Sequence, residues 1–162
     1  MRYYTVEHEI AALNPSAGDG VLIIEVPADL VVAVVRACLY NLENDVHEML
    51  HVGFFPITTK GSLAGGGAAP TPRKHDNGDA ASSVTVYEGG NTGMATEPDV
   101  WGDPYDEQGF SNLNGYEYNP PLIGLMGGPI ISPSGLAGLR MMAAPSAGFK
   151  AKALIEYAEI GG

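Results

Sequence analysis

Phe149-Lys-Ala-Lys-Ala-Leu-Ile-Glu-Tyr-Ala-Glu-Ile160 is the clearest structural signal in this chain. Apolar side chains at 149, 151, 153, 155 and 157 alternate with charged ones at 150, 152 and 156. Such period-2 alternation predicts a half-buried antiparallel strand. Gly135–Ala144 reads as another strand, and the turn residues 144–148 between the two predict a hairpin. A lone hairpin is marginal in water, so the rest of the chain must supply further strands of a sheet or sandwich.

Further strands are expected upstream, each a short run of alternating or β-branched residues bounded by turn residues. They are Tyr3–Ile10, Val21–Val26, Glu48–Phe55, Ser83–Tyr87 and Tyr116–Tyr118. The sequence allows two structures for Leu30–Leu39, a helix capped by Asp29 or a strand, and the valines favour the strand. Pro56 is expected to end the strand that precedes it.

Glycine and proline define the expected loops. The 162-residue chain holds 22 glycines and 12 prolines, well above average usage, which indicates many turns and short strands. Most of them fall in two segments, about 57–82 and 89–133, which are expected to be long loops. With no internal repeat and no linker, the pattern predicts a single domain over residues 1–162. Its expected fold is all-β, an antiparallel β-sandwich or a jelly-roll-like arrangement.

The charge and the cysteine content narrow the classes of partner. A formal net charge of −11 disfavours nucleic acid and anionic membranes as partners. The apolar runs fall well short of the ~20 residues that cross a bilayer, and the N-terminus alternates like a strand rather than a signal peptide. We therefore expect a soluble protein made in a cytoplasm. Cys38, the one cysteine, excludes an internal disulfide and is expected to be a buried small hydrophobe.

His47-Glu48-Met49-Leu50-His51 matches the H-E-x-x-H signature of zinc metalloproteases. On a helix, the two histidines share a face and ligate zinc, while the glutamate acts as general base. Here the motif opens a predicted strand, along which the histidines lie about 13 Å apart, too far for one ion. We interpret the motif as coincidence and expect no metal ligands, no cofactor and no catalytic residues. A small zinc-dependent hydrolase remains the enzymatic alternative.

The two predicted loops hold three other candidate features. Gly65-Gly66-Gly67 lacks the G-K-[ST] ending of a phosphate loop and is expected to be a flexible tip. Acidic residues around Trp101 lack EF-hand spacing and are expected to be a solvated loop; they are Glu97, Asp99, Asp103, Asp106 and Glu107. Aromatic residues there predict either a sugar-binding platform or anchors that hold the loops on the core. They are Trp101, Tyr105, Phe110, Tyr116 and Tyr118.

A family resemblance rests on motifs that follow one another along the chain. They are Val21–Val26, Glu48–Phe55, Thr71-Pro72, Gly78–Ala81, Tyr116–Pro121, Ile131–Gly135 and Ala153–Glu159. In this order they resemble the small β-sandwich virion proteins of tailed bacteriophages, of the capsid decoration (cement) type. The resemblance implies a non-enzymatic protein on the capsid exterior that binds the major capsid protein and stabilises the lattice. It also implies self-association, expected as a trimer, and contact surfaces in the long loops.

A second binding function remains open beside this one. A carbohydrate-binding adhesin-type virion module would use Trp101 and the nearby tyrosines to stack on sugar rings. Loss of glycan binding on Trp101→Ala would favour that alternative.

Overall fold

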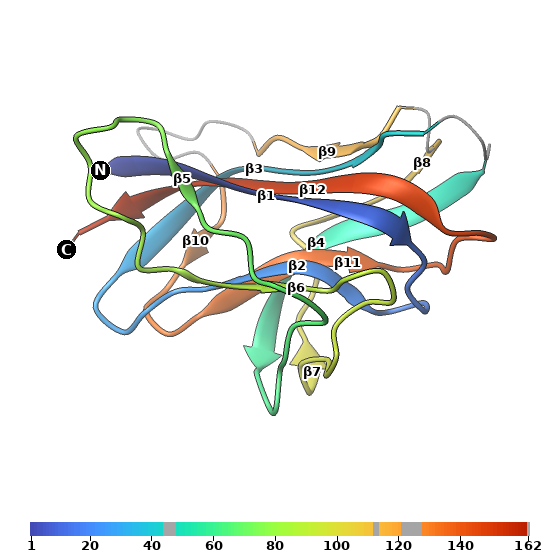
Figure 1. Ribbon diagram of the computed structural model, residues 1–162. Helices are drawn as coiled ribbons and strands as arrows, with labels where there is room; N and C mark the ends of the chain where they lie inside the picture. The colour runs from blue at the N-terminus through green and yellow to red at the C-terminus, as the bar shows by residue number, and fades with distance from the viewer. Residues whose placement is uncertain (44–47, 112–113, 121–127, 162) are drawn as a thin grey trace.

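The computed structural model describes residues 1–43, 48–111, 114–120 and 128–161. These residues form two antiparallel sheets that pack face to face as a β-sandwich, and no helix occurs among them (Figure 1). No helix in this part of the chain is long and apolar enough to span a membrane. The predicted all-β sandwich is therefore confirmed.

The first sheet, sheet A, has the strand order β10-β3-β12-β1-β5, with β9 also paired to β3. Its strands are β1 (Arg2–Leu13), β3 (Val31–Asn41), β5 (Arg73–Lys74), β9 (Tyr116–Tyr118), β10 (Ile130–Ile131) and β12 (Phe149–Ile160). Strand β12 lies in the middle and pairs with β1 on one side and β3 on the other (Figure 1). The predicted segment 30–39 is thus strand from Val31 onward, as its valines predicted.

The second sheet, sheet B, has the order β6-β2-β11-β4-β7, with β8 also paired to β4. Its strands are β2 (Gly20–Glu25), β4 (Met49–Thr59), β6 (Thr85–Glu88), β7 (Val100–Trp101), β8 (Asp106–Ser111) and β11 (Leu136–Met141). The predicted hairpin of the last two strands is wrong, because β11 belongs to sheet B and β12 to sheet A. The turn at 144–148 instead carries the chain from one sheet to the other.

The main core fills the space between the sheets. The apolar face predicted for β12 is confirmed, since its side chains at 149, 151, 153, 155 and 157 are all buried. Tyr4 and Tyr157 stack on neighbouring strands with their ring centroids 5.6 Å apart. Phe54 and Leu139 of sheet B belong to the same core cluster and are fully buried. Burying an aliphatic or aromatic side chain contributes about 1.5–3 kcal/mol, so this layer is the main source of stability.

Pro56 does not end its strand, contrary to the expectation. It lies inside β4, opposite Ala137 of β11, and the strand continues to Thr59. The Pro56 carbonyl accepts a hydrogen bond at 2.8 Å from the N–H of Gly102, which lies between β7 and β8. Because the nitrogen and the carbonyl of a strand residue point to the same edge, the Pro56 ring nitrogen also points toward the β7–β8 loop. No ladder hydrogen bond is lost there, because the loop linking those two short strands faces the proline.

The described parts of the two long loops contain more regular structure than their sequence predicts. The expected loop 57–82 begins inside β4 and contains β5, and the expected loop 89–133 contains β7, β8, β9 and β10. Parts of both loops cover the outer face of sheet B with a second apolar cluster. It comprises Ile23, Ile57, Leu63, Met94 and Leu136. As a result β2, which contributes Ile23 to this cluster, is buried on both faces, as its apolar run predicted.

The segment Gly65–Gly67 is not a flexible tip but packs against the end of β6. The Gly66 N–H donates to the Glu88 carbonyl at 2.7 Å. A Cβ on Gly66 would lie 2.5 Å from the Gly89 carbonyl oxygen. Glycine is required here because two backbones approach each other closely.

Candidate functional site

The H-E-x-x-H segment is extended where the structure describes it. Met49–His51 lie in β4, and His47 lies outside the described residues. The Glu48 carboxylate accepts a hydrogen bond from the Ser146 N–H at 2.9 Å. His51 Nε2 lies 2.8 Å from Glu107 Oε1 on the neighbouring strand β8. Met49–His51 are therefore strand, as predicted, whereas Glu48 lies just before β4, and His51 and Glu48 contact different partners.

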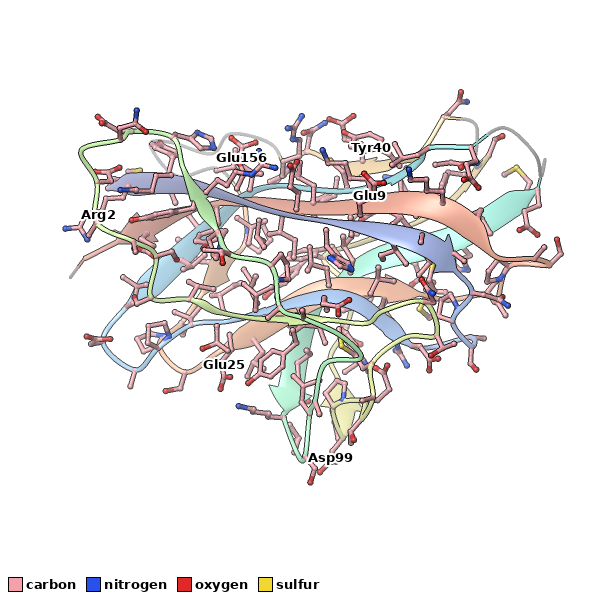
Figure 2. All side chains as sticks on the ribbon, viewed as in Figure 1. Arg2, Glu9, Glu25, Tyr40, Asp99 and Glu156 are labelled. Atoms are coloured by element: carbon pink, nitrogen blue, oxygen red, sulfur yellow. The ribbon has the colours of Figure 1, made fainter. Side chains whose placement is uncertain are left out.

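The five acidic residues around Trp101 do not converge on one point. Glu97 accepts hydrogen bonds from the Gly20 N–H at 2.9 Å and the Met94 N–H at 3.3 Å, and burial raises the pKa of its carboxyl group. Asp106 accepts from the Gln108 side chain at 2.8 Å, and Asp99 lies at the far tip of the loop region (Figure 2). Within the described chain, no three His, Cys, Asp or Glu side chains are grouped so as to hold a metal ion.

Most of the candidate aromatic residues anchor loops and short strands on the core. Phe54 lies between Tyr105 and Tyr118, at ring-centroid distances of 5.7 and 5.9 Å. Phe110 and Tyr116 contact each other at 6.2 Å. Burial raises the pKa of the Tyr105, Tyr116 and Tyr118 hydroxyls above its ordinary value of 10.0. These contacts favour the anchoring interpretation over an open sugar platform.

Trp101 is half-buried, and one of its neighbours is a cation. The Arg140 guanidinium carbon lies 5.1 Å from the centroid of Trp101 and 5.6 Å from that of Phe55. Arg140 Nε also donates a hydrogen bond to the Gly18 carbonyl at 2.6 Å. The cation–π contacts join β11, β4 and β7 on the outer side of sheet B. A sugar ring would have to share the indole with this arginine.

A buried polar network holds the first long loop against sheet A. Ser82 Oγ donates to Glu159 Oε1 at 2.6 Å, and the Glu159 side chain is almost fully buried. The hydroxyl of Tyr157 lies 2.7 Å from the same Ser82 oxygen. Because the one Ser82 proton is used on the carboxylate, Tyr157 is the donor in this second bond. Burial also raises the pKa of the Tyr157 hydroxyl above its ordinary value of 10.0.

Ion pairs cross the outer face of sheet A from strand to strand, and we call this set the charge ladder; two of its members, Glu9 and Glu156, are labelled in Figure 2. Its pairs are Arg73–Glu7, Lys152–Glu7 at 2.6 Å, Lys150–Glu9 at 2.6 Å, Arg36–Glu156 at 3.4 Å and Arg36–Glu117 at 3.7 Å. Sequence alternation placed Lys150, Lys152 and Glu156 on this face. It did not identify their partners, because cross-strand register is not encoded in the spacing along one strand.

Cys38 is fully buried in β3, as predicted, and burial raises the pKa of its thiol. A thiol whose ionised form is disfavoured is a poor nucleophile and a poor metal ligand. Its environment is that of a small hydrophobic side chain in the middle of sheet A.

Comparisons with family models, with curated proteins and with solved structures gave no match. The geometry of the fold and the motifs of the sequence are therefore the basis for a functional proposal.

Proposed function

We propose that this chain is a non-enzymatic virion structural protein that binds the outer surface of a phage capsid lattice and stabilises it. The proposal starts from the motif order that resembles capsid decoration proteins. The observation that supports it best is that described parts of both long loops are fixed onto the sandwich. Ser82 ties the first loop to Glu159 of sheet A, and Leu63 and Met94 bring parts of both loops into the second apolar cluster.

Fixed loops suit a protein that binds the same lattice site many times. Ordering a mobile surface on binding opposes association by about 0.5–1.5 kcal/mol for each immobilised side chain. A loop that is already held by hydrogen bonds and apolar contacts avoids much of that loss. The acidic composition adds to the argument, since a net charge of −11 disfavours binding to packaged DNA.

Cosedimentation with capsid shells tests the proposal directly. Shells would come from the tailed phage that encodes this chain, assembled without it, and be mixed with increasing amounts of the purified protein. We expect saturable binding at a fixed ratio to the major capsid protein. The absence of binding to both empty shells and DNA-filled heads would overturn the proposal. Zinc content and glycan binding would then test the two alternatives.

Two charge reversals would show which loop contacts the lattice. Asp76→Lys changes an exposed residue of the first long loop, and Asp103→Lys changes one of the second. Both add the same charge at sites outside the apolar clusters, so each variant serves as the control for the other. A loop that contacts the capsid should give weaker binding in one variant only.

A further inference from the structure

Asparagine is followed directly by glycine at two places in this chain, Asn77-Gly78 and Asn114-Gly115. In such a pair the backbone nitrogen of the glycine can attack the side-chain amide carbon of the asparagine, because glycine has no Cβ to hinder the approach. The first pair lies in an exposed turn that follows β5 at the edge of sheet A (Figure 1). We call residues 76–79 the Asn77 turn.

The backbone of the Asn77 turn is held in place, while the Asn77 side chain is free. The Asp79 N–H donates to the Asp76 carbonyl at 3.1 Å. Lys74 Nζ donates to the carbonyl oxygens of Asp79 at 2.8 Å and Asn77 at 3.3 Å. Within the described part of the chain, no group forms a hydrogen bond with the side-chain amide of Asn77. This exposed amide can therefore rotate toward the Gly78 nitrogen, and water can reach it.

A carboxylate is already bonded to the nitrogen that would attack. Asp76 Oδ1 accepts a hydrogen bond from the Gly78 N–H at 2.8 Å. A backbone amide is a poor nucleophile until this proton is removed, and a carboxylate at hydrogen-bond distance is within the reach required of a general base. The turn thus brings together the three groups that a ring closure needs, which are an amide carbon, a nitrogen and a base.

We propose that the Asn77 turn is a self-modification site at which Asn77 loses its side-chain nitrogen through a cyclic imide formed with Gly78. Asp76 takes the Gly78 proton as the nitrogen attacks the side-chain carbon of Asn77, and the new C–N bond closes a succinimide ring. The old C–N bond breaks, and the amide nitrogen leaves as ammonia with the proton that Asp76 returns. Water then opens the ring at either carbonyl, which gives aspartate or isoaspartate. The net reaction is hydrolysis of an amide, so water is the co-reactant and nothing is oxidised or reduced.

The product would change the charge of a distinctive part of the chain. Arg73, Lys74 and His75 directly precede the turn and form a basic run in a protein whose net charge is −11. A carboxylate at position 77 adds a negative charge beside this run, and the isoaspartate form also lengthens the backbone of the turn. The charge and shape of this part of the first long loop therefore change as the protein ages. The modification does not depend on capsid binding, so either proposal can fail without the other.

The second pair provides a reference within the same chain. Gly115 packs against β3, and a Cβ there would lie 2.8 Å from Tyr40 Cδ1 and 3.0 Å from the Leu39 carbonyl oxygen. Among the described residues, no carboxylate is bonded to the Gly115 N–H. Because its nitrogen is held against the sheet and has no base beside it, we expect Asn114 to react more slowly than Asn77.

Mass spectrometry of proteolytic peptides tests the site. The purified full chain would be kept at neutral pH and sampled over several weeks, with the modified residue located by fragmentation. We expect the peptide that contains Asn77 to gain the mass of an amide converted to an acid and to separate into aspartate and isoaspartate forms. The peptide that contains Asn114 should change much less over the same period.

Two matched variants separate a base from a carboxylate that only holds the turn. Asp76→Asn keeps an oxygen that can accept the Gly78 N–H but is not basic, so the rate at Asn77 should fall about tenfold or more. Asp79→Asn removes the same charge from the same turn, and it should leave the rate unchanged because the Asp79 side chain is not bonded to Gly78. Thermal unfolding of each variant checks that it is folded.

A third variant tests the attacking nitrogen. Gly78→Ala should slow the reaction because its methyl group hinders ring closure, and it should fold, since a Cβ there would meet only Asp76 Oδ1, at 3.3 Å. An Asn77 side chain that keeps its amide for as long as Asn114 does would overturn the proposal. So would a rate that Asp76→Asn leaves unchanged. Equal slowing by Asp76→Asn and Asp79→Asn would show an effect of net charge alone and would overturn the role of Asp76 as the base.

Discussion

Among substitutions that remove one side-chain oxygen from the long loops, we expect Ser82→Ala to lower the free energy of unfolding the most. The variant removes a hydrogen bond to the buried Glu159 carboxylate, and bonds to charged groups contribute about 1.5–3 kcal/mol. It also leaves the buried Tyr157 hydroxyl without its acceptor, which costs about 1–3 kcal/mol. Because the two effects share one atom, we expect a combined loss of about 2–4 kcal/mol rather than the full sum. The total free energy of unfolding of a domain of this kind is about 5–15 kcal/mol.

Urea unfolding at neutral pH, followed by far-ultraviolet circular dichroism, would measure this loss. The matched control is Ser83→Ala, because the Ser83 side chain is exposed and only its backbone N–H reaches Glu159. We expect the control to change the free energy of unfolding by less than about 0.5 kcal/mol. The midpoint should fall in Ser82→Ala while the m-value is retained. Equal stability of the two variants would refute the idea that Ser82 fastens the loop.

Three further outcomes are expected. Gly53→Ala should destabilise the fold by about 1–3 kcal/mol in urea titrations, because its Cβ would lie 2.7 Å from the Asp106 carbonyl oxygen; Gly109→Ala on the paired strand, with 3.9 Å of space, should not, and equal effects would contradict the steric argument. Glu97→Gln should gain stability relative to wild type between pH 4 and pH 7. Because burial raises the pKa of the Glu97 carboxyl group, this group stabilises the folded state at pH values below its ordinary pKa of 4.5, and that stabilisation is lost as the group ionises at higher pH. A gain in stability that is the same at pH 4 and pH 7 would argue against this reasoning. Arg140→Lys should shift the emission of Trp101, the single tryptophan, to longer wavelength, because a lysine does not stack as a planar group. Unchanged emission would show that the stack does not shield the indole.

Local pattern predicted the strands whose inner face is buried, and it predicted them closely. Strand β12 begins and ends where its alternation does, at Phe149 and Ile160, and β9 matches Tyr116–Tyr118. The alternation could not say which sheet each strand joins, because a period of 2 is the same in both. The alternation and the turn residues at 144–148 therefore predict a hairpin, although this turn joins two sheets.

The sequence could not predict the strands and ion pairs that depend on a partner far away along the chain. Strand β8 reads Asp-Glu-Gln-Gly-Phe-Ser, a poor strand former, yet it is ordered because β4 offers it a free edge. Arg73 lies in a predicted loop and reaches Glu7 only because β5 pairs with β1. From their closeness in sequence, the five acidic residues near Trp101 are expected to form one solvated acidic loop. The fold gives several of them separate backbone or side-chain partners instead.

The central position of β12 has a consequence for how the chain is made. Strands β1 and β3 each need β12 as a neighbour, so neither can complete its pairing until residues 149–160 have left the ribosome. At about 5–20 residues per second, β1 waits on the order of ten seconds for its partner. During that time the edges of two long apolar strands are open to other nascent chains. Synthesis of this protein on crowded polysomes should therefore depend on chaperones far more than refolding of the finished chain at high dilution.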